Sequence, residues 1–235
     1  MGYSRMTTQG RAKVNRNNHP FAGKVPGTRF ALAHNGVLYN DTALRRSRVL
    51  PDTKIETDSY VAVQLIEQQG ALTPASLRAM AEMVEGSFVY TVLDEKDSFY
   101  FVRGDNPLCL VQFPRVGLYV YASTREILYA ALKRTWLRWE TPIEIPVAGG
   151  EILTITPEGA RMSEHFTCDG DYFTRWYLRR RGSRLCEPLV SRTELPYLRE
   201  LKNIASYLGY SGDEIDAMLA EGWSTDEIEE AIYGC

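Results

Sequence analysis

The sequence contains few of the residues that build metal centres and disulfide frameworks. Its 235 residues include four cysteines and three histidines, and the cysteines are scattered without a Cys-x-x-Cys pair. This spacing excludes the common zinc motifs and predicts reduced thiols. We therefore expect a cytoplasmic protein that needs no metal or other cofactor.

Long apolar runs and a strong net charge are also missing. No run approaches the length of a transmembrane helix, and the N-terminal cations are not followed by the apolar core of a signal peptide. The formal net charge of −3 gives no general attraction to nucleic acid or to an anionic membrane. The length predicts one large domain, with or without a small appendage.

The first sixty residues carry groups suited to binding a small charged amino acid. Arg5 has a planar cationic fork that pairs with a carboxylate, and the Asp58 carboxylate could hold an ammonium group. Asn35 offers a side-chain amide donor, and Gly36 offers a backbone N–H that a ligand can approach closely. Two such neighbouring donors are what a tetrahedral oxyanion needs.

The same stretch resembles the class II glutamine amidotransferase domain, an N-terminal-nucleophile glutaminase unit. The resemblance covers roughly residues 2–162, with weaker matches at 103–108 and 122–126. It rests on four segments in matching order and spacing, which are Arg5–Gly10, His19-Pro20, His34-Asn35-Gly36 and Glu56-Thr57-Asp58.

The resemblance implies a function and a set of site residues. It implies that the domain binds glutamine and, in a complete protein, hydrolyses the side-chain amide to glutamate and ammonia for an acceptor. We recognise no acceptor domain after residue 165, so we expect the acceptor to be another chain or to be absent. The predicted site residues are Asn35 and Gly36 for the oxyanion hole, Arg5, Thr8, His34 and Asp58 for the substrate, and His19 for the local structure of the site.

The nucleophile is the main departure from the family. The family uses a cysteine at position one, whose own α-amine moves the proton. Here the sequence begins Met1-Gly2, and the first cysteine is Cys109, inside an expected strand. We therefore predict no glutaminase activity for this chain and hypothesise that Met1 is an internal methionine of a longer protein. The alternative is a catalytically inactive module that senses glutamine or glutamate, and either form could be a homo-oligomer.

Local patterns predict an α+β fold, and the resemblance implies a four-layer αββα sandwich of antiparallel sheets without its first strands. Asn35-Gly36 is typical of a tight hairpin turn between strands at 30–33 and 37–39. Thr57 or Asp58 is expected to cap a helix that stops at Gly70. The other expectations are a loop over 1–28, helices at 41–49, 124–133 and from Thr73-Pro74 to Gly86, and strands at 87–93, 98–102, 108–113, 118–121, 151–155 and 160–165.

The C-terminal third predicts a linker and a small helical bundle. We expect an amidotransferase-like domain over 1–165, a linker over 166–193 and a three-helix module over 194–235. The linker contains a run of basic and aromatic residues at 175–184, a composition that can bind RNA or single-stranded DNA. Because the net charge of the chain is negative, we consider a solvent-exposed face the better interpretation of this run and nucleic-acid binding unlikely. Ser211–Glu214 and Ser224–Glu227 are capping-box sequences, and the module loosely resembles ubiquitin-associated bundles, which favours an interaction role.

Overall fold

The computed structural model describes two units of the chain. They comprise Met1–Arg180 and Arg181–Cys235, and each is considered by itself. The division falls within the stretch predicted as a linker. The described residues are 13–167, 201, 202, 205, 210–221, 223, 228, 231 and 232.

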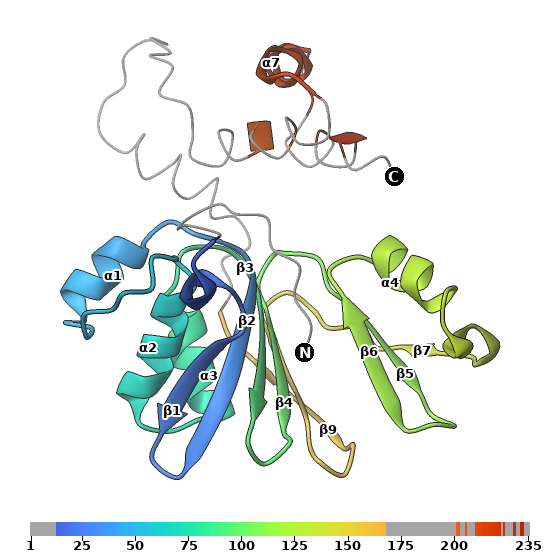
Figure 1. Cartoon of the computed structure of the whole chain (residues 1–235), viewed down its shortest axis with the longest axis horizontal. Coiled ribbons are helices and arrows are strands. Elements are labelled where there is room, and N and C mark those ends of the chain that lie inside the picture. Colours follow the sequence, from blue (N-terminus) through green and yellow to red (C-terminus); the bar gives the residue numbers. More distant parts are fainter. Residues whose placement is uncertain are drawn as a thin grey trace. The chain divides into compact units, whose positions relative to one another are not determined.

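The first unit is a mixed α/β structure with two antiparallel sheets (Figure 1). The larger sheet has the strand order β1-β2-β3-β4-β8-β9, and the smaller has the order β6-β5-β7. The elements are η1 (Asn15–Asn17), β1 (Phe21–Val25), β2 (Thr28–Leu38), α1 (Asp41–Ser47), α2 (Tyr60–Gln69), α3 (Pro74–Ala81), β3 (Gly86–Asp94), β4 (Phe99–Arg103), β5 (Cys109–Phe113), β6 (Leu118–Ala122), α4 (Arg125–Leu132), η2 (Trp136–Trp139), β7 (Ile143–Glu144), β8 (Glu151–Ile155) and β9 (Arg161–His165).

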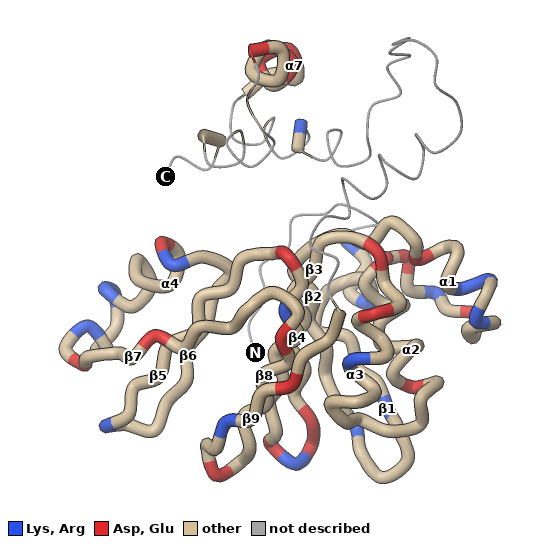
Figure 2. The backbone as a smooth tube through the Cα atoms, turned by 180° about the vertical axis from the view of Figure 1, so that it is seen from behind, with Lys and Arg blue, Asp and Glu red and all other residues tan. Residues whose placement is uncertain are grey.

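Three hydrophobic clusters join these elements. The first packs α2 and α3 against one face of the six-stranded sheet, the second lies between the two sheets, and the third packs α4 against the other face of the small sheet. Successive side chains of strand β4 point to opposite faces of the large sheet. Tyr100 and Val102 join the first cluster, whereas Phe99 and Phe101 join the second. This alternation follows from the two-residue period of a strand. Figure 2 shows the same arrangement from behind, with α2 and α3 on the side of the large sheet away from α4.

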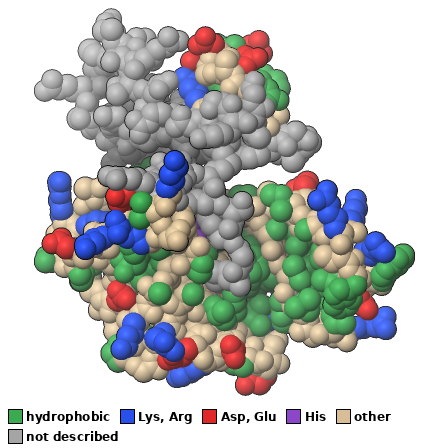
Figure 3. All heavy atoms as spheres, in the orientation of Figure 1, with side chains coloured by type: hydrophobic (Ala, Val, Ile, Leu, Met, Phe, Trp, Pro, Cys, Tyr) green, Lys and Arg blue, Asp and Glu red, His purple; other side chains and the backbone are tan. Residues whose placement is uncertain are grey.

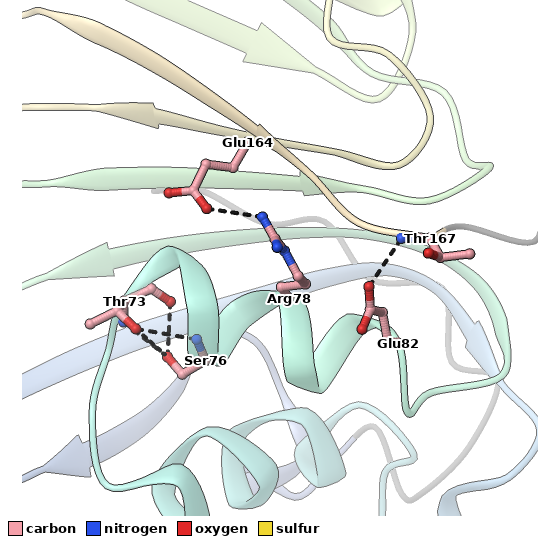
Figure 4. Close-up of polar contacts among 6 residues, drawn as sticks. All are labelled: Thr73, Ser76, Arg78, Glu82, Glu164 and Thr167. Carbon is pink, nitrogen blue, oxygen red and sulfur yellow. Dashed lines mark hydrogen bonds and ion pairs between the residues drawn. The ribbon is translucent and has the colours of Figure 1, made fainter.

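Local signals set the end of α2 and the start of α3 as predicted. Gly70 follows α2 in the left-handed conformation, with φ of 73°. Thr73 and Ser76 form a reciprocal capping box at the start of α3, and Pro74 occupies its first turn. Further along α3, Arg78 pairs with Glu164 of β9, and Glu82 accepts a hydrogen bond from the Thr167 N–H (Figure 4). These contacts fix α3 against the edge of the large sheet.

Four local predictions are wrong. The expected loop over 1–28 contains strand β1, which turns into β2 at Pro26-Gly27, where Gly27 has φ of 78°. The expected hairpin turn at Asn35-Gly36 is the interior of β2, which continues to Leu38. Neither Thr57 nor Asp58 caps α2, because its N-cap residue is Ser59. Helix α3 ends at Ala81 rather than near Gly86, which begins β3.

Exposed apolar side chains gather around the small sheet. Trp136 and Trp139 are 61% and 77% exposed, and Lys133, Arg134 and Arg138 are exposed beside them. In Figure 3, hydrophobic and basic side chains cover this side of the first unit. Aromatic side chains mixed with arginine are typical of protein interfaces. The other large exposed apolar residues of this region are Val116, Leu118, Ile127 and Ile143.

The second unit has a small core of its own. Helix α7 (Gly212–Ala220) begins with the predicted capping box between Ser211 and Glu214. Ile215 is buried in a cluster with apolar residues from other helical segments, which are Leu201, Ala205, Ile228 and Ile232. The predicted cap at Ser224–Glu227 and the basic run at 175–184 lie outside the described residues. No described helix is long and apolar enough to cross a membrane.

Candidate functional site

Asn35 and Gly36 lie side by side within β2, opposite Val89 and Phe88 of β3. Gly36 has φ of 138°, and a Cβ atom there would lie 2.0 Å from the carbonyl oxygen of Ser87. Only glycine therefore fits this position. The half-buried Asn35 side-chain amide forms no hydrogen bond with any residue between 13 and 167, so it remains available to a ligand.

The ladder geometry directs the Gly36 N–H away from β3. The Phe88 N–H donates to Asp105 Oδ1 (3.1 Å), and the Phe88 carbonyl accepts from the Gly104 N–H (2.9 Å). Phe88 therefore exchanges no ladder bonds with Gly36, because alternate antiparallel pairs are non-hydrogen-bonded. On its other side β2 pairs with β1 only as far as Leu32. The Gly36 N–H therefore faces the side of β2 where no strand of the described residues pairs with it.

The turn after β4 holds this part of β2 in place. The side-chain amide of Asn106 donates to the Asn35 carbonyl oxygen at 2.9 Å. The Arg103 guanidinium donates in turn to the carbonyl oxygens of Asn106 and Val147. The sequence identified residues 103–108 only as a weak match and did not reveal that Asn106 supports Asn35.

Asp58 is a buried carboxylate beside the same side of β2. It is 3% exposed, its Oδ2 accepts from the Leu38 N–H at 2.7 Å, and its Oδ1 accepts from the Ser59 hydroxyl at 3.3 Å. Leu38 and Gly36 are two residues apart, so their N–H groups point the same way. Within residues 13–167, no lysine or arginine forms an ion pair with Asp58. A buried carboxylate normally has a cationic partner.

His34 does not supply that positive charge at neutral pH. Its ring is 1% exposed, stacks on Tyr90 at 4.7 Å, and places Nε2 3.4 Å from the Ser87 carbonyl oxygen. Burial lowers the pKa of His34 below its ordinary value of 6.5, outweighing Asp58 and the Ser87 carbonyl, which raise it. The neutral ring donates from Nε2 to Ser87 and accepts from the Ser59 hydroxyl at Nδ1, 2.9 Å away.

Two contacts hold the Glu56-Thr57-Asp58 segment. Asn17, which is fully buried, exchanges two 3.0 Å hydrogen bonds with Glu56, one to its side chain and one from its backbone. Arg45 donates to the Thr57 carbonyl oxygen at 3.1 Å. The sequence predicted only that Arg45 belongs to a helix over 41–49, because neither contact leaves a local signal.

The predicted site residues that the structure describes lie in one region. His34 and Asp58 meet through Ser59, and His19 packs edge-on against Phe21, with its ring 6.5 Å from that of His34. His34 and Asn35 point to opposite faces of the sheet, as successive strand residues do. Arg5 and Thr8 lie outside the described residues. Among the described residues, no group of three or more His, Cys, Asp or Glu could hold a metal ion.

His34 should make stability fall in mild acid. Since its folded pKa lies below the unfolded value of about 6.5, the unfolded chain binds the proton first as pH falls. The free energy of unfolding should therefore drop from pH 7 towards pH 5.5, by up to about 1.4 kcal/mol per pH unit. In urea unfolding, His34→Gln should remove this slope and His165→Gln should keep it, because His165 is exposed. An unchanged slope in His34→Gln would contradict the assignment.

Comparison with known proteins agrees with this geometry. Residues 5–130, more than half of the chain, match the family described as "Glutamine amidotransferase domain". The chain belongs to this family. Its predicted resemblance is therefore confirmed, and the matched stretch of this amidotransferase domain includes both Asn35-Gly36 and Asp58.

Curated relatives of this amidotransferase domain are longer proteins. The glutamine–fructose-6-phosphate aminotransferase (isomerizing) of Halalkalibacterium halodurans is 32% identical over 128 residues, which are 52% of this chain and 21% of the relative. The Staphylococcus aureus protein of the same name is 33% identical over 116 residues, covering 47% and 19% of the two chains. The chain thus spans about a fifth of the length of these relatives.

Two solved structures, one of them an amidotransferase by its description, share the fold. Glutamine phosphoribosylpyrophosphate amidotransferase from B. subtilis superposes with a TM-score of 0.54 at 25% identity, covering 66% of this chain and 33% of the other. An enzyme described as the allosteric regulatory enzyme of purine biosynthesis gives 0.53 at 25% identity, covering 65% and 32%. The first unit is therefore an amidotransferase-type fold.

Proposed function

We propose that this chain is the glutamine-binding part of an amidotransferase. In this proposal the Asp58 carboxylate holds the α-ammonium group of glutamine, Arg5 holds the α-carboxylate, and Thr8 contacts the substrate. The single observation that carries the proposal is the buried Asp58, which has no cationic partner between residues 13 and 167. It accepts from the Leu38 N–H, on the side of β2 that the Gly36 N–H also faces. A ligand ammonium would provide the missing positive charge.

The oxyanion hole of this proposal consists of the Asn35 side-chain amide and the Gly36 N–H. Both groups are hydrogen-bond donors without a partner among the described residues. Asn106 holds the Asn35 carbonyl oxygen, and Asp105 holds the N–H of Phe88, which lies opposite Gly36 on β3. Preorganised donors of this kind stabilise the negative charge that develops when an amide is attacked. In this proposal His34 and His19 support the local structure beside these donors.

Cys109 is a poor candidate for the nucleophile that attacks the amide. It lies buried in β5, its Sγ is 3.7 Å from Glu144 Oε1, and burial, followed by Glu144, raises the pKa of its thiol. A raised pKa leaves less of the reactive thiolate at neutral pH. We therefore expect residues 1–235 to bind glutamine without releasing ammonia.

The proposal also covers the layers of the first unit, the C-terminal module and a partner chain. The three hydrophobic clusters of the first unit support a four-layer αββα sandwich over residues 1–165. A linker over 166–193 would follow, and the separate cluster around Ile215 supports a three-helix interaction module over 194–235. Ammonia would pass to a separate acceptor chain in the cytoplasm, and the exposed surface around Trp136 and Trp139 supports the presence of a partner chain. The sensing module is not favoured, because the homologous domains belong to glutamine-hydrolysing enzymes.

Titration calorimetry with L-glutamine tests the proposal. The wild-type chain should bind glutamine, and Arg5→Ala should weaken binding about 10- to 100-fold, as expected for the loss of charged hydrogen bonds worth about 1.5–3 kcal/mol. Arg46→Ala is the matched control, since Arg46 is an exposed cation on α1 and should leave binding unchanged. No binding by folded wild-type protein at millimolar glutamine would refute the proposal.

A further inference from the structure

Ser59 occupies the N-cap position of α2 but does not cap the helix. Serine at this position normally accepts a hydrogen bond from a backbone N–H of the first turn, a contact worth about 1 kcal/mol. Here the side chain makes no capping bond. It lies 4% exposed between His34 Nδ1 at 2.9 Å and Asp58 Oδ1 at 3.3 Å.

The tautomer of His34 decides where the Ser59 proton points. The Ser87 carbonyl can only accept, so the hydrogen on the neutral ring lies on Nε2, and Nδ1 must accept. A hydroxyl has one proton, and the shorter contact directs it to His34. Asp58 Oδ1, 3.3 Å from the Ser59 oxygen, receives the weaker share of the same proton, as in a three-centre hydrogen bond.

This arrangement leaves Asp58 held but not neutralised. Its Oδ2 is fixed by the Leu38 N–H, and Ser59 limits the rotation of Oδ1 from the opposite side. A carboxylate offers about four lone-pair sites, and the strand uses one of them. The free sites are those that an ammonium group needs. The buried hydroxyl of Tyr90 supplies no competing donor, because it forms no hydrogen bond with any described residue.

We propose that Ser59, held by His34, is a positioning residue that orients the Asp58 carboxylate to select ligands with an α-ammonium group. This inference rests on the proposed function and extends it from Asp58 to the residues behind it. The selected class is α-amino acid amides, as opposed to amides with the same carbon chain and carboxylate but no amine.

The test compares two ligands that differ only in the amine. L-Glutamine and 4-carbamoylbutanoate, which is glutamine without its α-amine, are titrated into the ¹⁵N-labelled full chain and followed by amide chemical shifts. The variants are Ser59→Ala and, as a matched control, Ser76→Ala. Ser76 is also a buried serine at a helix N-terminus, but its hydroxyl forms hydrogen bonds only with Thr73 among the described residues. The same spectra show whether each variant is folded.

Ser59→Ala should weaken glutamine binding about three- to tenfold, which corresponds to the loss of one net hydrogen bond of about 0.5–1.5 kcal/mol. It should leave 4-carbamoylbutanoate binding within twofold, and Ser76→Ala should change neither. Equal weakening of both ligands, or no weakening of glutamine, would overturn the role of Ser59 while leaving the proposed function intact. Wild-type protein that bound neither ligand would overturn the proposed function itself.

Discussion

Gly36→Ala is expected to cost more than about 4 kcal/mol of unfolding free energy, a loss that few single substitutions reach. The added Cβ would lie 2.0 Å from the Ser87 carbonyl oxygen and 2.9 Å from the Asn106 side-chain nitrogen. Both neighbours are constrained, since Ser87 belongs to β3 and Asn106 is bonded to Asn35. The backbone at φ of 138° is a further strain for any L-residue.

Gly27→Ala is the matched control for this prediction. Gly27 also has a positive φ, of 78°, but no heavy atom lies within 4 Å of a Cβ built there. Its substitution should cost only about 1–2 kcal/mol, the usual penalty of the left-handed region. Urea unfolding followed by circular dichroism measures both values. Similar costs for the two variants would show that β2 can move away from β3, contrary to the rigid site described above.

Asp58→Asn should change binding and stability in opposite directions. Glutamine affinity should fall about 100-fold, because the ammonium would lose a charged partner worth about 1.5–3 kcal/mol. The ligand-free protein should be at least as stable as the wild type, since an amide oxygen still accepts from the Leu38 N–H and a buried, uncompensated charge is removed. Calorimetric titration and urea unfolding give the two quantities.

Asp94→Asn provides the contrast. Asp94 is also a buried carboxylate, but it accepts from the N–H groups of Lys96 and Ser98 and from the Tyr100 hydroxyl, at the end of β3 away from Gly36. We expect it to lose about 1–2 kcal/mol of stability and to bind glutamine normally. A large stability loss in Asp58→Asn, with glutamine binding unchanged, would identify Asp58 as a purely structural residue.

Local sequence signals identified most helices and strands but misread Asn35-Gly36. Asn-Gly between apolar residues is the strongest short hairpin signal. In the structure these residues continue β2 because Phe88 and the turn at 103–108 hold them from one side. Strand β1, before the turn at Pro26-Gly27, was not predicted because it contains only two large apolar residues, Phe21 and Val25, next to a polar segment.

The site residues were predictable from the resemblance, whereas the residues that hold them were not. Asn106 lies 71 positions from Asn35, and Asn17 lies 39 from Glu56. Contacts over such distances leave no periodicity or spacing in the sequence. Ser59 illustrates the same limit, because a serine at a helix start indicates a cap, and only the folded chain reveals its contact with His34.

The most direct test of the central claim is an amide chemical-shift map of the ¹⁵N-labelled chain during titration with L-glutamine. The account predicts saturable shifts concentrated at Gly36 and Leu38 of β2 and at residues 57–59, with little change in β5–β7 or α7. Shifts confined to other regions, or their absence at tens of millimolar glutamine in a folded sample, would contradict a glutamine site at Asn35, Gly36 and Asp58.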